Sequence, residues 1–167
     1  MSGEKRKTNG GKRKMSEAQA YTALTARCAV TEYCLADIRR MMDRWELPDG
    51  AAERIEERLV KERFVDHERY AHAFVRDKLR FAHWGKQKIC QQLRLKGIEQ
   101  ALIDDACTEI ADDHLETLRQ LIAAKRRTVK ASSEYELNAK LCRFAYSRGF
   151  SFSEINEVLH TSFEDGD

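Results

Sequence analysis

The chain has 167 residues and a mass of 19.4 kDa, which fits one domain or a short array of small units. Hydrophobic residues make up 42% and charged residues 35% of it, with a formal net charge of +2, which excludes disorder throughout. No stretch approaches the roughly 18 consecutive apolar residues of a membrane span, and no export signal is recognisable, so we expect a cytoplasmic protein.

A basic segment precedes the first predicted helix. Residues 5–7 and 12–14 are all Lys or Arg, against a single acid at Glu4. We expect residues 1–15 to form a flexible basic tail, which is either an electrostatic contact for a partner or a solubilising extension. Apolar periodicity also ends after Thr161, and an acidic tail is expected at residues 164–167.

From Ser16 onward the sequence predicts helices and no strands. Pro48 is the single proline, and Val, Ile and Thr never show the two-residue alternation of a half-buried strand. Capping-box spacing, which marks helix starts, joins Ser16 to Gln19, Ser133 to Glu136 and Ser151 to Glu154. Gly97 and Gly149 each follow an apolar periodic run, as glycines at helix ends do.

The apolar pattern recurs with a period of about fifty residues. Six positions return after 51 residues, and five of them return again after a further 52. The three sets are Ile38, Met42, Leu47, Ala52, Ile55 and Leu59; Ile89, Leu93, Ile98, Ile103, Ala106 and Ile110; and Leu141, Ala145, Phe150, Ile155 and Val158. A three-helix unit of this length is too small to bury its apolar face alone, so neighbouring copies must complete each other's cores.

We therefore predict an all-α fold of three tandem three-helix repeats that form an elongated, curved array. The repeats are expected at residues 16–64, 65–113 and 114–163. Their first helices are expected at residues 16–30, 66–81 and 113–129, where apolar side chains recur at helical spacing.

Charge is strongly zoned along the array. Residues 69–97 hold eight basic residues and one acid, a net charge of +7, whereas residues 98–116 hold seven acids and no Lys or Arg. Residues 117–130 return to a net charge of +5. The small total charge therefore conceals a basic second repeat with an acidic third helix.

Three arginines of the second repeat fall on one narrow arc of its first predicted helix. At about 100° per residue, Arg69, Arg76 and Arg80 lie beside the apolar face. Such a stripe suits a phosphate backbone or an acidic protein groove, because guanidinium groups offer several donors in a planar fork. Alternatively, the arginines pair with the acidic third helix of the same repeat, where each ion pair adds little stability.

Trp84 and Gly85 stand between the first two predicted helices of this repeat. The favoured interpretation is a packed corner, in which glycine permits a tight turn and the indole fills the junction. The alternative is an anion site, made by free N–H groups at the start of the next helix together with Lys86 and Lys88.

The sequence offers little support for catalysis. It contains no Gly-rich phosphate loop, no GxSxG and no HExxH motif. The adjacent acids Asp104–Asp105 and Asp112–Asp113 could hold magnesium in a nuclease, but neighbouring helix positions point in different directions, so solvated faces or caps are expected. We expect a protein that is not an enzyme and that uses no cofactor.

We also expect no metal site. The five histidines are dispersed, and none lies three or four residues from another histidine or a cysteine. The cysteines occupy apolar helix-like positions rather than CxxC pairs, and we expect free buried thiols at Cys28, Cys34, Cys90, Cys107 and Cys142.

The run RFVDHERYAHAFVRDKLRFAHWGKQKICQQLRLKGI, residues 63–98, resembles the signature of the RecX family. The agreement spans many spaced positions, namely Phe64-Val65-Asp66, Arg69-Tyr70-Ala71, Phe74-Val75-Arg76, Gly85-Lys86, Ile89, Leu93 and Lys96-Gly97-Ile98. Members of that family are built from three three-helix repeats, so the resemblance extends over about residues 16–162.

The resemblance implies a monomer that binds the RecA recombinase and its filament on single-stranded DNA, with possible weak direct DNA contact and no membrane partner. Inhibition of recombinase, ATPase and coprotease activities in homologous recombination, DNA repair and the SOS response is the expected effect. The residues expected to contact the filament or DNA are Arg69, Arg76, Lys78, Arg80, Lys86, Lys88, Arg94 and Lys96. The residues expected to support them are Phe64, Asp66, Tyr70, Phe74, Trp84, Gly85, Ile89, Leu93 and Gly97.

Two other functions stay open at this point. One is an autonomous helical module that binds nucleic acid without RecA, and the basic residues between positions 69 and 97 are the reason to consider it. The other is an adaptor that uses the repeat surface to hold another protein without DNA. Without the resemblance, the residues alone do not decide among the three.

Overall fold

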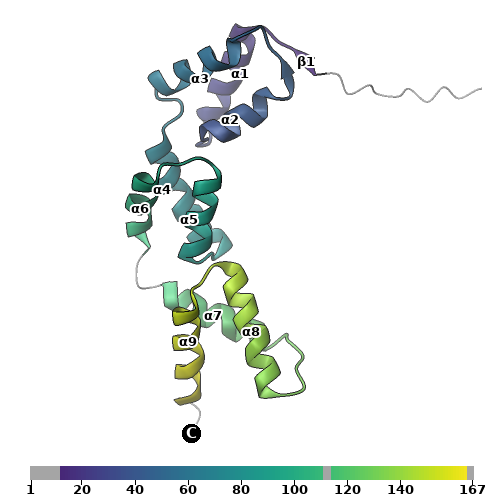
Figure 1. Ribbon diagram of the computed structural model, residues 1–167, viewed down its shortest axis with the longest axis vertical. Coiled ribbons are helices and arrows are strands. Elements are labelled where there is room, and N and C mark those ends of the chain that lie inside the picture. Colours follow the sequence, from purple (N-terminus) through teal and green to yellow (C-terminus); the bar gives the residue numbers. More distant parts are fainter. Residues whose placement is uncertain (1–11, 111–113, 165–167) are drawn as a thin grey trace, which may run out of the picture. The chain divides into compact units, whose positions relative to one another are not determined.

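The computed structural model describes residues 12–110 and 114–164, with side chains as far as residue 160, and nearly all of its regular structure is helical (Figure 1). The chain divides into two compact units, one ending at Asp66 and the other beginning at His67. The described residues form nine α-helices in successive groups of three. The all-α architecture of three-helix repeats predicted from the sequence is thus confirmed.

The first unit holds one repeat. Its helices are α1 (Glu17–Cys28), α2 (Leu35–Met42) and α3 (Ala51–Lys61). The predicted capping box at the start of α1 is present, because the Ser16 hydroxyl accepts from the Gln19 N–H while the Gln19 side chain accepts from the Ser16 N–H. Residues Leu24, Ile38, Ile55 and Leu59 from the three helices meet in a core that is closed to solvent.

A short parallel pairing of strands corrects two predictions for this unit, namely the absence of strands after Ser16 and the flexible tail before it. Strand β1 (Arg13–Lys14) pairs with β2 (Trp45–Glu46), which lies between α2 and α3. The Met15 N–H donates to the Glu46 carbonyl at 3.1 Å, and the Met15 side chain is buried in the first core. The expectation of a flexible tail is therefore wrong for residues 13–15, since backbone pairing and an apolar anchor hold them; residues 1–11 lie outside the described part.

The second unit holds two repeats. The second repeat comprises α4 (His67–Asp77), the π-helical turn η1 (Lys78–Ala82), α5 (Lys86–Leu95), α6 (Gln100–Ala106) and the 3₁₀ turn η2 (Cys107–Glu109). The third repeat comprises α7 (His114–Arg126), α8 (Glu134–Arg148) and α9 (Phe152–Glu164). The backbone stays helical through Glu164, so the helix continues beyond the end of apolar periodicity at Thr161 and includes the first residue of the predicted acidic tail.

The first helix of the second repeat differs from its predicted form. An α-helix was expected through residue 81, but α-helical geometry ends at Asp77 and a π-helical turn follows. The wide turn is closed by the Trp84 N–H, which donates to the Lys78 carbonyl at 3.1 Å. His83 then adopts a left-handed conformation with φ of 50°, which ends the helical run.

The predicted repeat of apolar positions corresponds to the buried interior. Ile38, Ile89 and Leu141 occupy the same place in successive repeats, and all three are fully buried. The next equivalents are buried as well, namely Met42, Leu93 and Ala145, and then Ile55, Ala106 and Val158. The periodicity therefore reflects one packing scheme used three times.

The third repeat closes around Phe150. This side chain is fully buried and stacks on the His114 ring, with centroids 5.8 Å apart and planes 5° apart. His114 Nε2 lies 2.5 Å from a Glu154 carboxylate oxygen, which ties α7 to the start of α9. Glu154 also accepts from the N–H and hydroxyl of Ser151, so the predicted capping box of α9 is formed.

Across residues 12–110 and 114–164, no helix combines the length and the apolar character needed to cross a membrane.

Candidate functional site

The corner between α4 and α5 is built on a series of aromatic rings. Tyr70 and Phe74 lie one turn apart on α4, with ring centroids 5.9 Å apart, and Phe74 meets Trp84 edge to face at 6.4 Å. Tyr70 is buried, whereas Phe74 and Trp84 are half-buried. The sequence interpretation of Trp84 as part of a packed corner agrees with this geometry.

Two lysines flank the exposed part of this corner. Lys78 Nζ lies 5.1 Å from the Phe74 centroid and 5.2 Å from the Trp84 centroid, and Lys88 Nζ lies 4.7 Å from the Trp84 centroid. These distances are within the range of cation–π attraction. We call the surface formed by Phe74, Lys78, Trp84 and Lys88 the aromatic corner.

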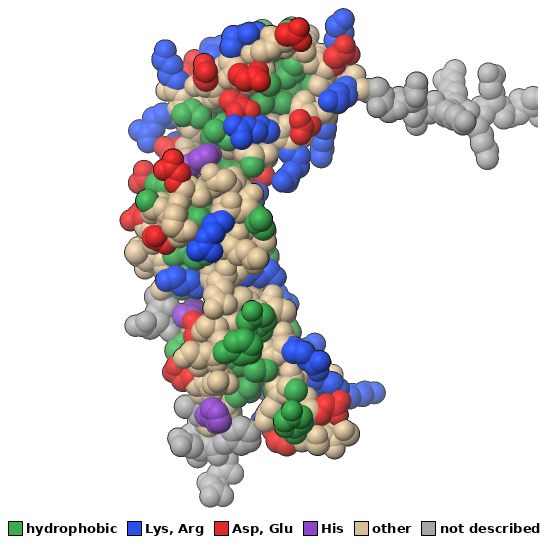
Figure 2. Space-filling view, viewed as in Figure 1, with side chains coloured by type: hydrophobic (Ala, Val, Ile, Leu, Met, Phe, Trp, Pro, Cys, Tyr) green, Lys and Arg blue, Asp and Glu red, His purple; other side chains and the backbone are tan. Residues whose placement is uncertain are grey.

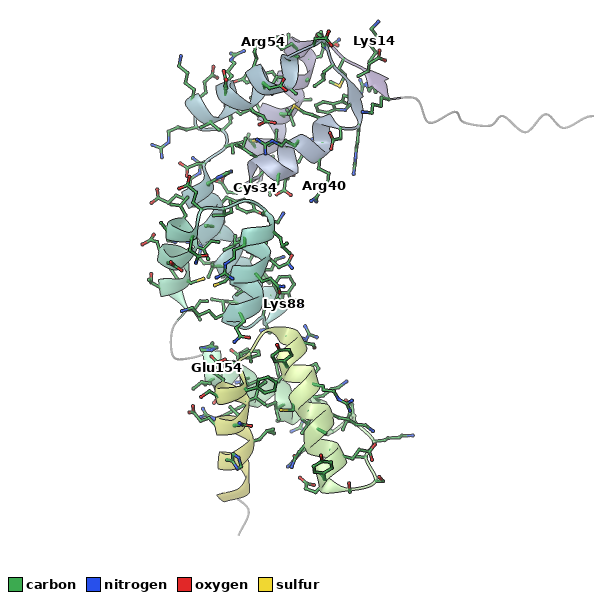
Figure 3. The ribbon with its side chains drawn as sticks, in the orientation of Figure 1. Lys14, Cys34, Arg40, Arg54, Lys88 and Glu154 are labelled. Atoms are coloured by element: carbon green, nitrogen blue, oxygen red, sulfur yellow. The ribbon has the colours of Figure 1, made fainter. Side chains whose placement is uncertain are left out.

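The aromatic corner is fixed against the third repeat by two glycines. The Gly85 N–H donates to the Arg148 carbonyl at 2.8 Å, and the Gln87 N–H donates to the Gly149 carbonyl at 3.1 Å. A Cβ atom on Gly85 would lie 2.3 Å from the carbonyl carbon and oxygen of Gly149, so only glycine permits this approach. Lys88, labelled in Figure 3 at the start of α5, donates from Nζ to the Ser147 carbonyl at 3.1 Å.

These bonds correct the alternative interpretation of an anion site at the start of α5. Such a site needs N–H groups that point toward a ligand. The N–H groups of Gly85 and Gln87 are used by carbonyls at the end of α8. The start of α5 therefore caps another helix, and the packed corner is the interpretation that the geometry supports.

The predicted arginine stripe is only partly preserved. Arg69 and Arg76 share the α-helical register of α4, but Arg80 lies in the π-helical turn, where that register no longer holds. Arg76 Nη1 lies 3.4 Å from a carboxylate oxygen of Glu109, so the alternative of pairing with the acidic end of the repeat applies at Arg76. The Arg76 side chain is still 62% exposed and stays accessible to a partner.

The other predicted contact residues lie around the same repeat. Arg80 is exposed and its guanidinium lies 5.3 Å from the centroid of Phe81, while Lys86 is exposed at the first position of α5. Arg94 donates from Nε to the Gln100 side chain at 2.8 Å. Lys96 Nζ lies 5.7 Å from the centroid of Tyr70, the first ring of the aromatic series. The contacts of these cations thus involve different parts of the repeat, and the predicted stripe is interrupted at Arg80.

The residues predicted to support the site divide between the two units. Phe64 packs against the first core and Asp66 accepts from Arg63, so both belong to the unit that ends at Asp66. Ile89 and Leu93 are fully buried in the second repeat. Gly97 ends α5 with φ of 76°, a conformation that favours glycine.

The sequence reasoning missed an exposed aromatic pair in the third repeat. Tyr146 and Phe152 stack with centroids 4.8 Å apart and are 52% and 59% exposed. Figure 2 shows hydrophobic side chains gathered on the surface over α8. In the sequence, Tyr146 and Phe152 stand on either side of buried Phe150, at positions that the apolar repeat does not use. Aromatic residues outside the repeating core positions are the signal that could have revealed the pair.

A cation at the end of α8 joins the two repeats. Arg148 donates from Nη1 to the Ala82 carbonyl at 3.4 Å, and its guanidinium lies 5.4 Å from the Phe144 centroid. A surface of aromatic rings and cations thus continues from the aromatic corner onto the third repeat. Such a surface can bind a polyanion by charge and a planar group by stacking.

The second repeat also contains two buried thiols that contact each other. Cys90 Sγ and Cys107 Sγ are 2.9 Å apart, and none of the five cysteines, which all lie in the described residues, forms a disulfide. Burial was predicted for all five, but Cys28 and Cys142 are only half-buried. Burial, together with the contact to Cys90, raises the pKa of Cys107 to about 12. Cys107 is therefore a neutral packing residue at physiological pH and not a nucleophile.

The chain is similar in sequence to known protein families and to individual proteins. Residues 66–106 match the family described as RecX, second three-helix domain, and residues 111–159 match RecX, third three-helix domain. The chain is 29% identical over 134 residues to the regulatory protein RecX of Clostridium acetobutylicum, covering 77% of this chain and 62% of that protein. It is 36% identical over 104 residues to the regulatory protein RecX of Vibrio campbellii, covering 62% of this chain and 64% of that protein.

A solved structure agrees with these matches. The crystal structure of a regulatory protein RecX superposes with a TM-score of 0.77 at 25% identity, covering 86% of this chain and 73% of that one. The chain spans a little under two thirds of the length of the Clostridium and Vibrio relatives. Because the two domain matches together cover more than half of the chain, it belongs to the RecX family of regulatory proteins.

Proposed function

We propose that this protein binds the RecA recombinase and its filament on single-stranded DNA, and that it inhibits the recombinase, ATPase and coprotease activities of that filament. The family membership supports a regulatory role, and the regulated partner follows from what the family resemblance implies. The aromatic corner and its continuation over α8 are the surface that we assign to the contact.

The observation that carries this proposal is the coupling of the aromatic corner to the third repeat. Hydrogen bonds from Gly85, Gln87 and Lys88 to the end of α8 hold cations and rings from two repeats in one fixed arrangement. A preorganised surface of this kind loses little conformational entropy on binding. It suits a repetitive, charged assembly better than a flexible basic segment would.

Charge reversal on the exposed part of this surface tests the proposal. The double variant Arg80→Glu and Lys86→Glu changes two exposed side chains near the aromatic corner. Reversed charges at a contact cost on the order of 1 kcal/mol or more each, so the concentration for half-inhibition of RecA ATP hydrolysis should rise at least about tenfold. Helical circular dichroism should not change.

The matched control is the double variant Arg127→Glu and Lys130→Glu. These exposed residues follow α7, and the change in net charge is the same. The control should inhibit like the natural protein, because the effect should depend on the place of the charge and not on the total. Equal inhibition by both double variants would remove the aromatic corner from the contact.

A binding comparison separates the proposal from an autonomous nucleic-acid-binding module. Affinity would be measured for free RecA, for the RecA filament and for bare single-stranded DNA, each at two salt concentrations. We expect the protein to bind the filament most tightly, and we expect this binding to depend less on salt than binding to bare DNA does. Equally tight, strongly salt-dependent binding to bare DNA would instead indicate the autonomous module.

A further inference from the structure

Four side chains from two segments of the second repeat meet on the side of α4 that faces α6. Glu68 and His72 lie one helical turn apart on α4. Asp105 on α6 and Glu109 at the end of η2 are also four residues apart. Because α4 packs directly against α6 and η2, the two pairs face each other.

His72 is held at both ring nitrogens. Its Nε2 lies 3.0 Å from Asp105 Oδ2, and its Nδ1 lies 2.6 Å from Glu109 Oε1. One ligand atom from each of Glu68, His72 and Asp105 lies within 4.8 Å of the other two. An imidazole nitrogen and two carboxylate oxygens thus converge on one point between α4 and α6.

We propose that Glu68, His72 and Asp105 form a binding site for a divalent transition-metal ion such as Zn²⁺, with His72 Nε2 as the nitrogen ligand. Imidazole and carboxylate groups are ordinary ligands of this ion, at bond lengths of about 2.0 to 2.2 Å. Three protein ligands leave a position for water, as in an open zinc site.

Glu109 is the independent observation that points to a metal. A histidine that binds a metal through one nitrogen usually donates its other N–H to a carboxylate, which fixes the ring orientation and raises its basicity as a ligand. Glu109 stands in that relation to Nδ1, at 2.6 Å, while Nε2 faces Asp105 at 3.0 Å. The cluster therefore contains an orienting carboxylate as well as a ligand set.

Exposure and charge are compatible with loading from solution. The His72 side chain is 22% exposed and that of Asp105 is 63% exposed, so a hydrated ion can reach the site and the carboxylates can move to bonding distance. Three carboxylates surround His72, and Arg76 pairs with one of them, Glu109. The local charge favours a cation, and a bound ion would tie α4 to α6.

The sequence reasoning missed this site because it compared histidines only with other histidines and cysteines. The informative spacing is the glutamate four residues before His72, which places both side chains on one face of a helix. The acidic partners are far away in sequence and become neighbours only through the packing of α6 on α4.

Isothermal titration of the full-length, reduced protein with Zn²⁺ tests the proposal. Cys90 and Cys107 could bind zinc themselves, so the double variant Cys90→Ser and Cys107→Ser serves as a background that should retain the site. Titration with Co²⁺ gives a second readout, because a site of nitrogen and oxygen ligands lacks the near-ultraviolet thiolate band.

We expect one saturable site that His72→Ala abolishes and that His160→Ala, an exposed histidine on α9, leaves unchanged. Glu109→Gln should raise the Kd about 10- to 100-fold, as loss of an orienting carboxylate does. Glu68→Gln, an exposed change that cannot disturb the core, should also weaken binding. The absence of saturable binding, survival of the site in His72→Ala, or its loss in the cysteine variant would overturn the proposal.

Discussion

Single carboxylates at helix starts contribute to stability in this protein in ways that depend on charge. Glu136, in the first turn of α8, accepts from Lys140 Nζ at 2.6 Å and from the hydroxyl and N–H of Ser132 at 2.6 and 2.8 Å. Lys140 and then Ser132 lower the pKa of Glu136 to about 2. The folded protein therefore holds this carboxylate ionised far below its ordinary range.

Replacing this carboxylate should produce a pH-dependent loss of stability. Because the folded-state pKa lies below the ordinary value of 4.5, the contribution of Glu136 is fully present above that value and is lost as pH falls toward 2. Glu136→Gln should therefore unfold at lower urea concentration than the natural protein at pH 7, and the difference should shrink between pH 4.5 and pH 2. Urea unfolding followed by circular dichroism at several pH values measures this.

A double-mutant cycle with Lys140→Gln isolates the ion pair from the cap. The coupling between the two substitutions should be measurable at pH 7 and should fall as the pH approaches 2, where about half of the carboxyl is protonated. A gap between Glu136→Gln and the natural protein that stays constant down to pH 2 would contradict this account.

Local sequence rules predicted helix caps well but not every partner. The boxes at Ser16 and Ser151 form with Gln19 and Glu154, as their spacing predicts. At Ser133 the hydroxyl does accept from the Glu136 N–H, but the Glu136 carboxylate turns to Ser132 instead. The two adjacent serines offer equivalent donors to the Glu136 carboxylate. Which serine it bonds to depends on the path of the preceding loop, and residue spacing does not encode that path.

At the scale of elements, glycines end helices in this protein for two different reasons, a left-handed backbone conformation and the close approach of α5 to α8. Gly97 and Gly149 end equivalent helices in successive repeats, with φ of 76° and 94°. A Cβ atom on Gly97 would meet open space, whereas one on Gly149 would lie 2.3 Å from Lys88 Cβ and 2.7 Å from Lys88 N. The two positions therefore share a backbone requirement and differ in crowding.

Alanine substitutions should separate the two effects. Gly97→Ala should cost about 1 kcal/mol of unfolding free energy, because alanine must adopt a left-handed conformation. Gly149→Ala should cost about 1 to 3 kcal/mol more, since it also forces apart α5 and α8. Gly85→Ala should lose stability through steric crowding alone, because Gly85 has a φ of −76°, which alanine adopts without strain. These values come from urea unfolding curves.

Equal losses for Gly97→Ala and Gly149→Ala would mean that the close approach of the two repeats adds nothing to stability. The result would also weaken the assignment of the aromatic corner to a fixed surface, because that surface depends on the same approach. Both helix ends were predictable from the pattern of a glycine after an apolar run. The contact between Gly85 and Gly149 was not, because it joins residues 64 positions apart in different repeats.

The π-helical turn marks another limit of the sequence at this scale. Residues 66–81 have continuous helical periodicity, and nothing in their spacing separates an α-helix from an α-helix that ends in a wider turn. The turn is closed by the Trp84 N–H bond to the Lys78 carbonyl, in a corner that the third repeat also contacts through Arg148. Its effect is to move Arg80 out of the register of Arg69 and Arg76.

At the scale of the whole chain, the three-repeat scheme was predictable because the buried positions recur at fixed intervals. What the period could not supply is which side chains of different repeats touch. The first repeat has its own core around Leu24, and the third has a core around Leu141; both residues are fully buried. The expectation that neighbouring copies must complete each other's cores is therefore wrong for the first repeat, whose core residues all lie between Met15 and Val65. The two cores belong to separate compact units, so truncating one core or the other should affect hydrogen exchange in different parts of the chain.

Truncating each core should destabilise different parts of the chain. Leu24→Ala and Leu141→Ala each remove a fully buried side chain, at a cost of about 2 to 5 kcal/mol. Leu24→Ala should speed amide hydrogen exchange in the unit that ends at Asp66. Leu141→Ala should speed exchange in α7–α9 and also at Gly85 and Gln87, because their N–H groups are bonded to carbonyls at the end of α8.

Hydrogen exchange followed by mass spectrometry, with fragmentation that resolves the start of α5, gives the readout. Protection of Gly85 and Gln87 should survive in Leu24→Ala and fall in Leu141→Ala, at equal global destabilisation. If both variants lose protection at these two amides to the same degree, the repeats unfold as one cooperative body. In that case the aromatic corner would depend on the entire array and not on the junction of α5 with α8.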